Sequence, residues 1–122
     1  MPSYLYFVEQ GATSLVETWN MMDSQLHCMM GHIEGWFYRF LAGIEMTGVG
    51  YKTFDVKPYF TDLIGRLTCE VGTIYGKIRV SYTRDESGHG QMTLDVPFGT
   101  EATVTLGEKC EVAGSGRHTF GF

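Results

Sequence analysis

The chain has 122 residues and a mass of 13.7 kDa, and a chain of this length buries roughly two-thirds of its unfolded surface in one core. Hydrophobic residues make up 43% and charged residues 19%, which excludes a disordered protein. The net charge is −5 and the sequence contains no run of basic residues, so we expect no nucleic-acid partner. We expect no membrane partner either, because no apolar stretch approaches the roughly 20 residues that span a bilayer.

The cysteines are odd in number and widely spaced, at Cys28, Cys69 and Cys110. This usage argues against a disulfide scaffold and against a zinc knuckle. We therefore expect three small buried side chains. Residues 1–10 lack the basic start and the small-residue cleavage site of a signal peptide. A cytoplasmic location fits both observations, whereas a periplasmic parent protein would carry its signal upstream.

The first third of the chain has helical spacing of apolar residues, from residue 11 to about residue 47. Residues 12–20 predict a short helix, followed by a loop at residues 21–24. The longer helix that follows is predicted to end at Gly48 and Gly50. Its apolar stripe consists of Leu26, Met29, Met30, Ile33, Phe37, Phe40, Leu41 and Ile44.

This second helix is apolar around much of its circumference, because Trp36 and Tyr38 widen the stripe. One short neighbouring helix and a small sheet would cover only part of such a surface. We therefore infer that the helical third packs into a larger helical assembly or that the chain oligomerises.

After Gly50 the apolar residues recur at every second position, which is typical of half-buried antiparallel strands. Turns are expected at residues 87–90 and 97–99, and residues 114–116 are predicted to be a hairpin turn between two last runs. The alternating apolar positions are Phe54, Val56, Leu67, Cys69, Val71, Ile78, Val80, Tyr82, Met92, Leu94, Val96, Ala102, Val104 and Leu106.

These patterns together predict an α+β chain. Two N-terminal helices would be followed by an antiparallel β-sandwich. The boundary is expected between residues 1–49 and residues 50–122.

Two side chains of the helical third could form a polar site. Glu17 lies among apolar and aromatic residues, and a carboxylate beside Trp19 could orient a water molecule as a general base. Most helix carboxylates are simply solvated, and an indole near a core usually fills it. His27 follows after a short loop and is placed to donate a hydrogen bond to a polar ligand.

A metal site is not expected. Histidine ligands on one helical face sit four residues apart, whereas His27 and His32 are five apart and therefore turned roughly 140° from each other. Cys28 does not complete a ligand set. The chain has no phosphate-binding glycine loop of the Walker or GxGxxG type, and we expect no cofactor.

Two segments carry a resemblance to a known family. Residues 9–19, EQGATSLVETW, and residues 27–44, HCMMGHIEGWFYRFLAGI, resemble the end of the catalytic domain of bacterial α-L-rhamnosidases. Residues 50–58, 73–78 and 114–118 are similar to the C-terminal domain of the same enzymes. The resemblance implies inverting glycoside hydrolases with an (α/α)6 barrel followed by a β-sandwich. Residues 1–49 would then be the last helices of the barrel.

The resemblance also implies roles for individual residues. The motif EQGATxxxExW of the family places the general base at Glu17, and the histidine that contacts rhamnose falls on His27. Trp19 and Trp36 match aromatic positions, with Trp19 expected at the substrate and Trp36 structural. The implied substrate is a rhamnose-containing glycoside.

Inversion needs a second carboxyl group, roughly 6.5–9.5 Å from the base, that protonates the leaving oxygen. In the family this acid belongs to an upstream motif, and no part of that motif occurs here. We therefore expect the isolated chain to be inactive, with the rest of the barrel or a second copy covering its helices.

A competing interpretation is a non-catalytic sugar-binding or structural accessory module, and a third is a truncated product without activity. The accessory module predicts that the isolated chain binds rhamnose or an oligosaccharide and continues to do so after Glu17→Gln.

Overall fold

The computed structural model describes residues 3–122, apart from the side chains of residues 29 and 30. The chain divides into two compact units, one up to Trp36 and one from Phe37 to Phe122. Within the described residues, no helix is both long enough and apolar enough to cross a bilayer.

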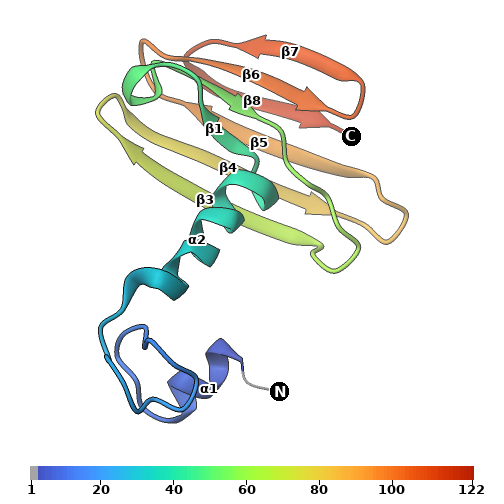
Figure 1. The fold of residues 1–122 in the computed structure, drawn as a ribbon. Helices are drawn as coiled ribbons and strands as arrows, with labels where there is room; N and C mark the ends of the chain where they lie inside the picture. Colours follow the sequence, from blue (N-terminus) through green and yellow to red (C-terminus); the bar gives the residue numbers. More distant parts are fainter. Residues whose placement is uncertain (1–2) are drawn as a thin grey trace. The chain divides into compact units, whose positions relative to one another are not determined.

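The first unit begins with helix α1 (Tyr4–Glu9) and continues as irregular chain through residues 10–27 (Figure 1). The prediction of a helix over residues 12–20 is therefore wrong. Hydroxyl, amide and carboxyl side chains in this stretch bond to nearby groups and compete with helical hydrogen bonds. The Ser14 hydroxyl, for example, donates to the backbone carbonyl of Gln25.

The second predicted helix is present between residues 28 and 41 in three successive forms. A 3-10 turn, η1 (Cys28–Gly31), precedes helix α2 (His32–Trp36), and a π-helical turn, η2 (Phe37–Leu41), follows it. The Ala42 N–H donates to the Phe37 carbonyl at 3.0 Å, which is the five-residue step of a π turn.

The predicted end of this helix near residue 47 is wrong. Gly43 has φ of +70° and stops the helix, and Ile44 is already paired with Val56 in a strand. In the apolar stripe, Leu41 is buried and Leu26 is 84% exposed. The side chains of Met29 and Met30 lie outside the described residues.

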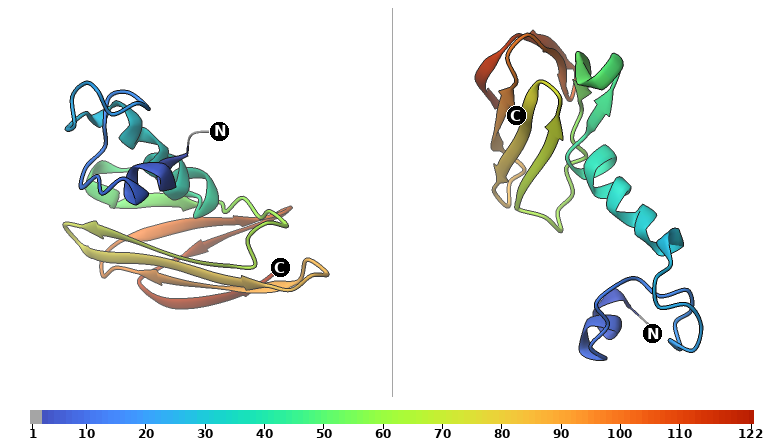
Figure 2. Two further views of the ribbon diagram at one scale, coloured as in Figure 1. Left: turned by 90° about the horizontal axis from the view of Figure 1, so that it is seen from below. Right: turned by 90° about the vertical axis from the view of Figure 1, so that its left-hand side faces the viewer.

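The second unit is a sandwich of two four-stranded sheets that lie face to face (Figures 1 and 2). The first sheet has the order β1 (Ile44–Met46), β2 (Thr53–Val56), β6 (Glu101–Leu106) and β7 (Lys109–Ala113). The second has the order β3 (Arg66–Thr73), β4 (Gly76–Arg84), β5 (Gly90–Val96) and β8 (Gly116–Gly121).

The predicted α+β class and the β-sandwich are confirmed, with two corrections. Strands β2 and β6 pair in parallel, with Phe54 opposite Ala102, whereas every other pairing is antiparallel. The turn at residues 114–116 is not a hairpin, because β7 pairs with β6 and β8 pairs with β5. This turn carries the chain from one sheet to the other.

The core of the sandwich consists of the alternating residues that point inward from both sheets. One end of it is filled by aromatic rings: Phe60 stacks on Phe122 at 3.9 Å between centroids and meets Tyr82 edge-on at 5.0 Å. The buried core members are Ala42, Ile44, Phe54, Val56, Ile78, Val80, Tyr82, Met92, Leu94, Val96, Ala102, Val104, Leu106 and Ala113.

The expectation of three buried cysteines is wrong for two of them. Cys28 and Cys110 are exposed, and only Cys69 is half-buried against the core. Burial raises the pKa of the Cys69 thiol, which keeps it protonated and unreactive at neutral pH.

A tight backbone crossing fixes the start of the sandwich. The Lys57 N–H donates to the Gly43 carbonyl at 2.9 Å, and a Cβ at residue 43 would overlap the backbone of Lys57 and Pro58. The positive φ and the lack of space therefore both require glycine at this position.

We expect Gly43→Ala to lower the free energy of unfolding by about 2–4 kcal/mol, because backbone atoms must move apart and the residue must adopt a strained conformation. Urea denaturation measures this loss. The control is Gly72→Ala in β3, where a Cβ meets nothing within 4 Å and where we expect a change within about 1 kcal/mol. Equal effects of the two substitutions would contradict the close approach of the Gly43 backbone to Lys57 and Pro58.

An ion pair joins strands β5 and β8 on the outer face. The Arg117 guanidinium donates to both carboxylate oxygens of Asp95, at 2.6 and 2.9 Å. These hydrogen bonds lower the pKa of Asp95 below its ordinary value.

The Asp95 ion pair therefore stabilises the fold fully above the ordinary aspartate pKa of about 3.9, and its contribution is lost as the pH falls through the lowered folded-state value. We expect Asp95→Asn to cost about 0.5–1 kcal/mol at pH 7 and less at pH 2. Denaturation curves at both pH values test this. Glu86→Gln, on an exposed turn, should cost little at either pH, and an Asp95→Asn effect that grew at low pH would contradict the pairing.

Candidate functional site

Glu17 and His27 lie on two segments that the backbone holds side by side within the first unit. The Glu17 N–H donates to the Ser24 carbonyl and the His27 N–H donates to the Leu15 carbonyl, each at 2.9 Å. The bond between Ser14 and Gln25 adds a third link. The chain therefore doubles back between residues 17 and 27 and brings the two predicted site residues together.

The two side chains face each other at ion-pair distance. His27 Nδ1 lies 3.8 Å from Glu17 Oε2, which is longer than a hydrogen bond. The Glu17 side chain is 42% exposed and the His27 side chain 35% exposed. The carboxylate can therefore accept hydrogen bonds from a water molecule or a hydroxyl group, and the imidazole can form a hydrogen bond to the same ligand.

The tip of this loop is tied together by polar side chains. The Thr18 hydroxyl lies 2.7 Å from the Asn20 side-chain oxygen and 2.9 Å from an Asp23 carboxylate oxygen. The Asn20 oxygen also accepts the Met22 N–H at 3.1 Å, and Met21 has a left-handed φ of +58°. These contacts fix the turn directly after Glu17 and so limit the directions in which the carboxylate can point.

Trp19 is held by the aromatic residues of α1. Its ring stacks on Phe7 with 4.9 Å between centroids and meets Tyr4 edge-on at 5.7 Å. Phe7 is buried, and the indole remains 38% exposed. One face of Trp19 is therefore used for packing, which leaves the exposed part of the ring for a ligand. Trp36 lies apart in sequence on α2 and is 42% exposed.

A cavity of about 230 Å³ lies next to this loop, and Glu17 does not line it. Its lining residues are Gln10, Gly11, Ala12, Thr13, Ser14, Val16, Met21 and Gln25. Across the described residues, no three His, Cys, Asp or Glu side chains come close enough to hold a metal ion. His27, Cys28 and His32 thus form no ligand set.

Sequence reasoning missed two parts of this site. Phe7 holds Trp19, and its only sequence signal is the recurrence of apolar residues within the first turns of α1. The bonds of Thr18 to Asn20 and Asp23 have no sequence signal beyond the presence of short polar side chains in a loop.

Comparison with known proteins links both units to one family. Residues 43–121 match the family described as bacterial α-L-rhamnosidase C-terminal domain, and residues 1–41 match its six-hairpin glycosidase domain. The chain is 34% identical over 116 residues to an α-L-rhamnosidase of Formosa agariphila and 30% identical over 112 residues to one of Alteromonas sp.. These matches cover 88% and 83% of the chain, but the chain spans only 12% of either relative.

Solved structures show the same fold. The α-L-rhamnosidase of Aspergillus terreus superposes on 99% of the chain with a TM-score of 0.86 at 23% identity, and the chain covers 16% of it. The Streptomyces avermitilis enzyme, solved in complex with L-rhamnose, superposes on 100% of the chain with a TM-score of 0.81 at 22% identity, and the chain covers 15% of it. The match to the C-terminal domain covers more than half of the chain. The chain therefore belongs to the bacterial α-L-rhamnosidase family and corresponds to the C-terminal portion of these proteins.

Proposed function

We propose that the chain contributes the general base to an inverting α-L-rhamnosidase, with Glu17 as that base. The observation that carries the proposal is the pair of Glu17 and His27, two half-exposed polar side chains held 3.8 Å apart. A carboxylate in this position has free lone pairs toward solvent and a neighbour that can bind the same ligand.

In the proposed reaction, Glu17 removes a proton from a water molecule while that water attacks the anomeric carbon. The glycosidic bond breaks on the opposite face of the sugar, and a carboxylic acid protonates the leaving oxygen. This acid would come from the part of the enzyme that precedes the chain in sequence. The isolated chain therefore holds half of the catalytic pair and is expected to be inactive.

His27 and Trp19 would contact the sugar. The His27 imidazole can donate to or accept from a sugar hydroxyl, and the exposed part of the Trp19 ring can cover its C–H groups. The three backbone and side-chain links between the two loop segments support this role for His27, because they hold it beside Glu17.

The helical residues would pack against the rest of the barrel. In the first unit, Ile33 and Trp36 are 38% and 42% exposed. In the second unit, Phe37 and Phe40 are 48% and 56% exposed. Apolar side chains at this level of exposure support a helix whose surface is completed by further helices. The division at residues 49 and 50 into barrel and sandwich stays a prediction.

Glu17→Gln tests the base in the full-length enzyme. The amide cannot take up the proton, so we expect turnover of an aryl α-L-rhamnoside to fall by about 100- to 10,000-fold with nearly unchanged thermal stability. Glu34→Gln on α2, which removes an exposed carboxylate of the same unit, should leave turnover unchanged. Near-normal turnover of Glu17→Gln would refute the assignment.

His27→Ala tests the sugar contact in the same enzyme. Loss of one hydrogen bond to the substrate should raise KM by about 3- to 10-fold, with a smaller change in kcat. The control is His32→Ala on α2, for which we expect no change in KM. A His27→Ala enzyme that lost kcat alone would place His27 in the chemical step rather than in binding.

A further inference from the structure

One side of the sandwich has two edge strands that belong to different sheets. Strand β7 is the last strand of the first sheet and β8 is the last strand of the second. Residues 114–116 join them at one end, and Figure 1 shows both strands (red) on the same side of the sandwich. The space between the sheets is therefore closed at the turn and opens to solvent along these two edges.

Two of the three inward positions of β7 carry charged residues instead of apolar ones, and the third is the buried Ala113. Glu111 lies opposite Val104 and Lys109 lies opposite Leu106 in the register of β6 and β7. Because paired residues point to the same face and Val104 and Leu106 are buried, Glu111 and Lys109 point between the sheets. The apolar Val112 points outward and is 65% exposed.

Strand β8 faces them with a histidine and an aromatic ring. His118 lies opposite Leu94 and Phe120 lies opposite Met92, both of which are buried, so these two side chains also point between the sheets. His118 Nε2 is 2.7 Å from the Gly114 carbonyl. A neutral imidazole that donates from Nε2 keeps Nδ1 as an acceptor.

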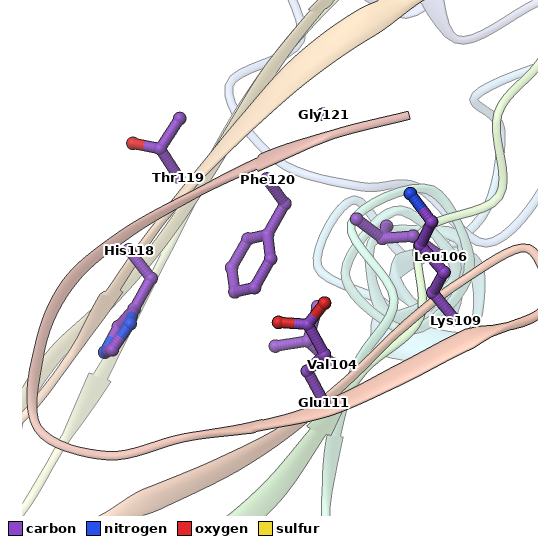
Figure 3. A pocket seen from close by; sticks show the side chains of 8 residues that line it. All are labelled: Val104, Leu106, Lys109, Glu111, His118, Thr119, Phe120 and Gly121. Atoms are coloured by element: carbon purple, nitrogen blue, oxygen red, sulfur yellow. The ribbon is translucent and has the colours of Figure 1, made fainter.

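Together with β6, these strands line an open pocket of about 310 Å³ (Figure 3). Val104 and Leu106 form its apolar wall, and the Phe120 ring and the Glu111 carboxylate point toward each other across it. Inward charges on an edge strand also discourage pairing with another sheet. That role does not account for a cavity lined by an aromatic ring and by hydrogen-bonding groups on both strands.

We propose that this pocket binds a neutral pyranose sugar. A pyranose has an apolar C–H surface, which suits Phe120 and Leu106, and hydroxyl groups, which suit Glu111 and Lys109. The ammonium and carboxylate groups have opposite signs, so the pocket has no net preference for an anion or a cation. The volume lies at the lower end of ligand pockets, which are roughly 300–1,000 Å³, and therefore suits one sugar ring rather than a chain.

The site is separate in sequence from Glu17 and His27. Only the choice of a rhamnoside as the first probe rests on the proposed function, because the pocket itself is defined by residues of the sandwich. The proposal thus places a second sugar site on the chain, one that needs no catalytic acid or base.

Titration of the ¹⁵N-labelled 122-residue chain with methyl α-L-rhamnopyranoside and methyl β-D-galactopyranoside tests the proposal by amide chemical-shift mapping. We expect at least one of the two glycosides to shift amides of β7 and β8 in a saturable way. Glu111→Gln should weaken this binding about tenfold, because hydrogen bonds to a carboxylate are stronger than those to an amide. Phe120→Leu should weaken it as well by removing the ring.

The matched control is Glu108→Gln, which removes an exposed carboxylate from the adjacent turn outside the pocket and should leave binding unchanged. Glu17→Gln should also leave it unchanged, whatever its effect on rhamnosidase activity. Shifts confined to residues 14–27 would overturn the proposal of sugar binding between β7 and β8, while supporting the proposed function. Absence of saturable shifts in β7 and β8 with both glycosides, or equal weakening by Glu108→Gln, would overturn it too.

Discussion

Every second side chain of a β-strand points to the same face, and in residues 37–122 that face is covered by a second sheet. Burial of each Val, Leu or Ile in this layer is worth about 1.5–3 kcal/mol, so the strands must keep their register for the unit to be stable. Strand β7 carries charged side chains at two inward positions, and it can do so because it is an edge strand. Its inward Lys109 and Glu111 reach solvent through the open side, where a charged group need not be desolvated.

The strands could be predicted from the sequence because their signal is local. Alternation in Ile78, Val80 and Tyr82, for example, is sufficient to identify β4 and its buried face. Two features depend on contacts between distant parts of the chain, and no local sequence pattern predicts them. They are the parallel pairing of β2 with β6 and the turn at residues 114–116, which joins the two sheets. The helix over residues 12–20 was predicted from apolar spacing alone, and the short polar side chains of that stretch outweigh the spacing.

The candidate sites also include one part that could be predicted from the sequence and one that could not. Family resemblance selected Glu17, Trp19 and His27, and the structure brings the carboxylate and the imidazole together, while their catalytic roles stay predictions. The sandwich pocket was not predicted. Alternation in β7 would place its apolar Val112 inward, whereas the register with β6 turns Glu111 inward. An edge strand has a weak preference for either face, so only its pairing decides which residues line the cavity.

The parallel contact between β2 and β6 has a consequence for the order of folding. Strands β3, β4 and β5 pair with their neighbours along the chain, so this part of the second sheet can form as soon as those residues are available. Strand β2 must wait for β6, whose Glu101 pairs with Thr53 across a loop of almost the whole second sheet. During synthesis β2 therefore leaves the ribosome with β1 as its only neighbour in the sheet, long before β6 exists. Until β6 arrives, one edge of β2 keeps unpaired backbone N–H and C=O groups, so the first sheet can be completed only after β3, β4 and β5 have been synthesised.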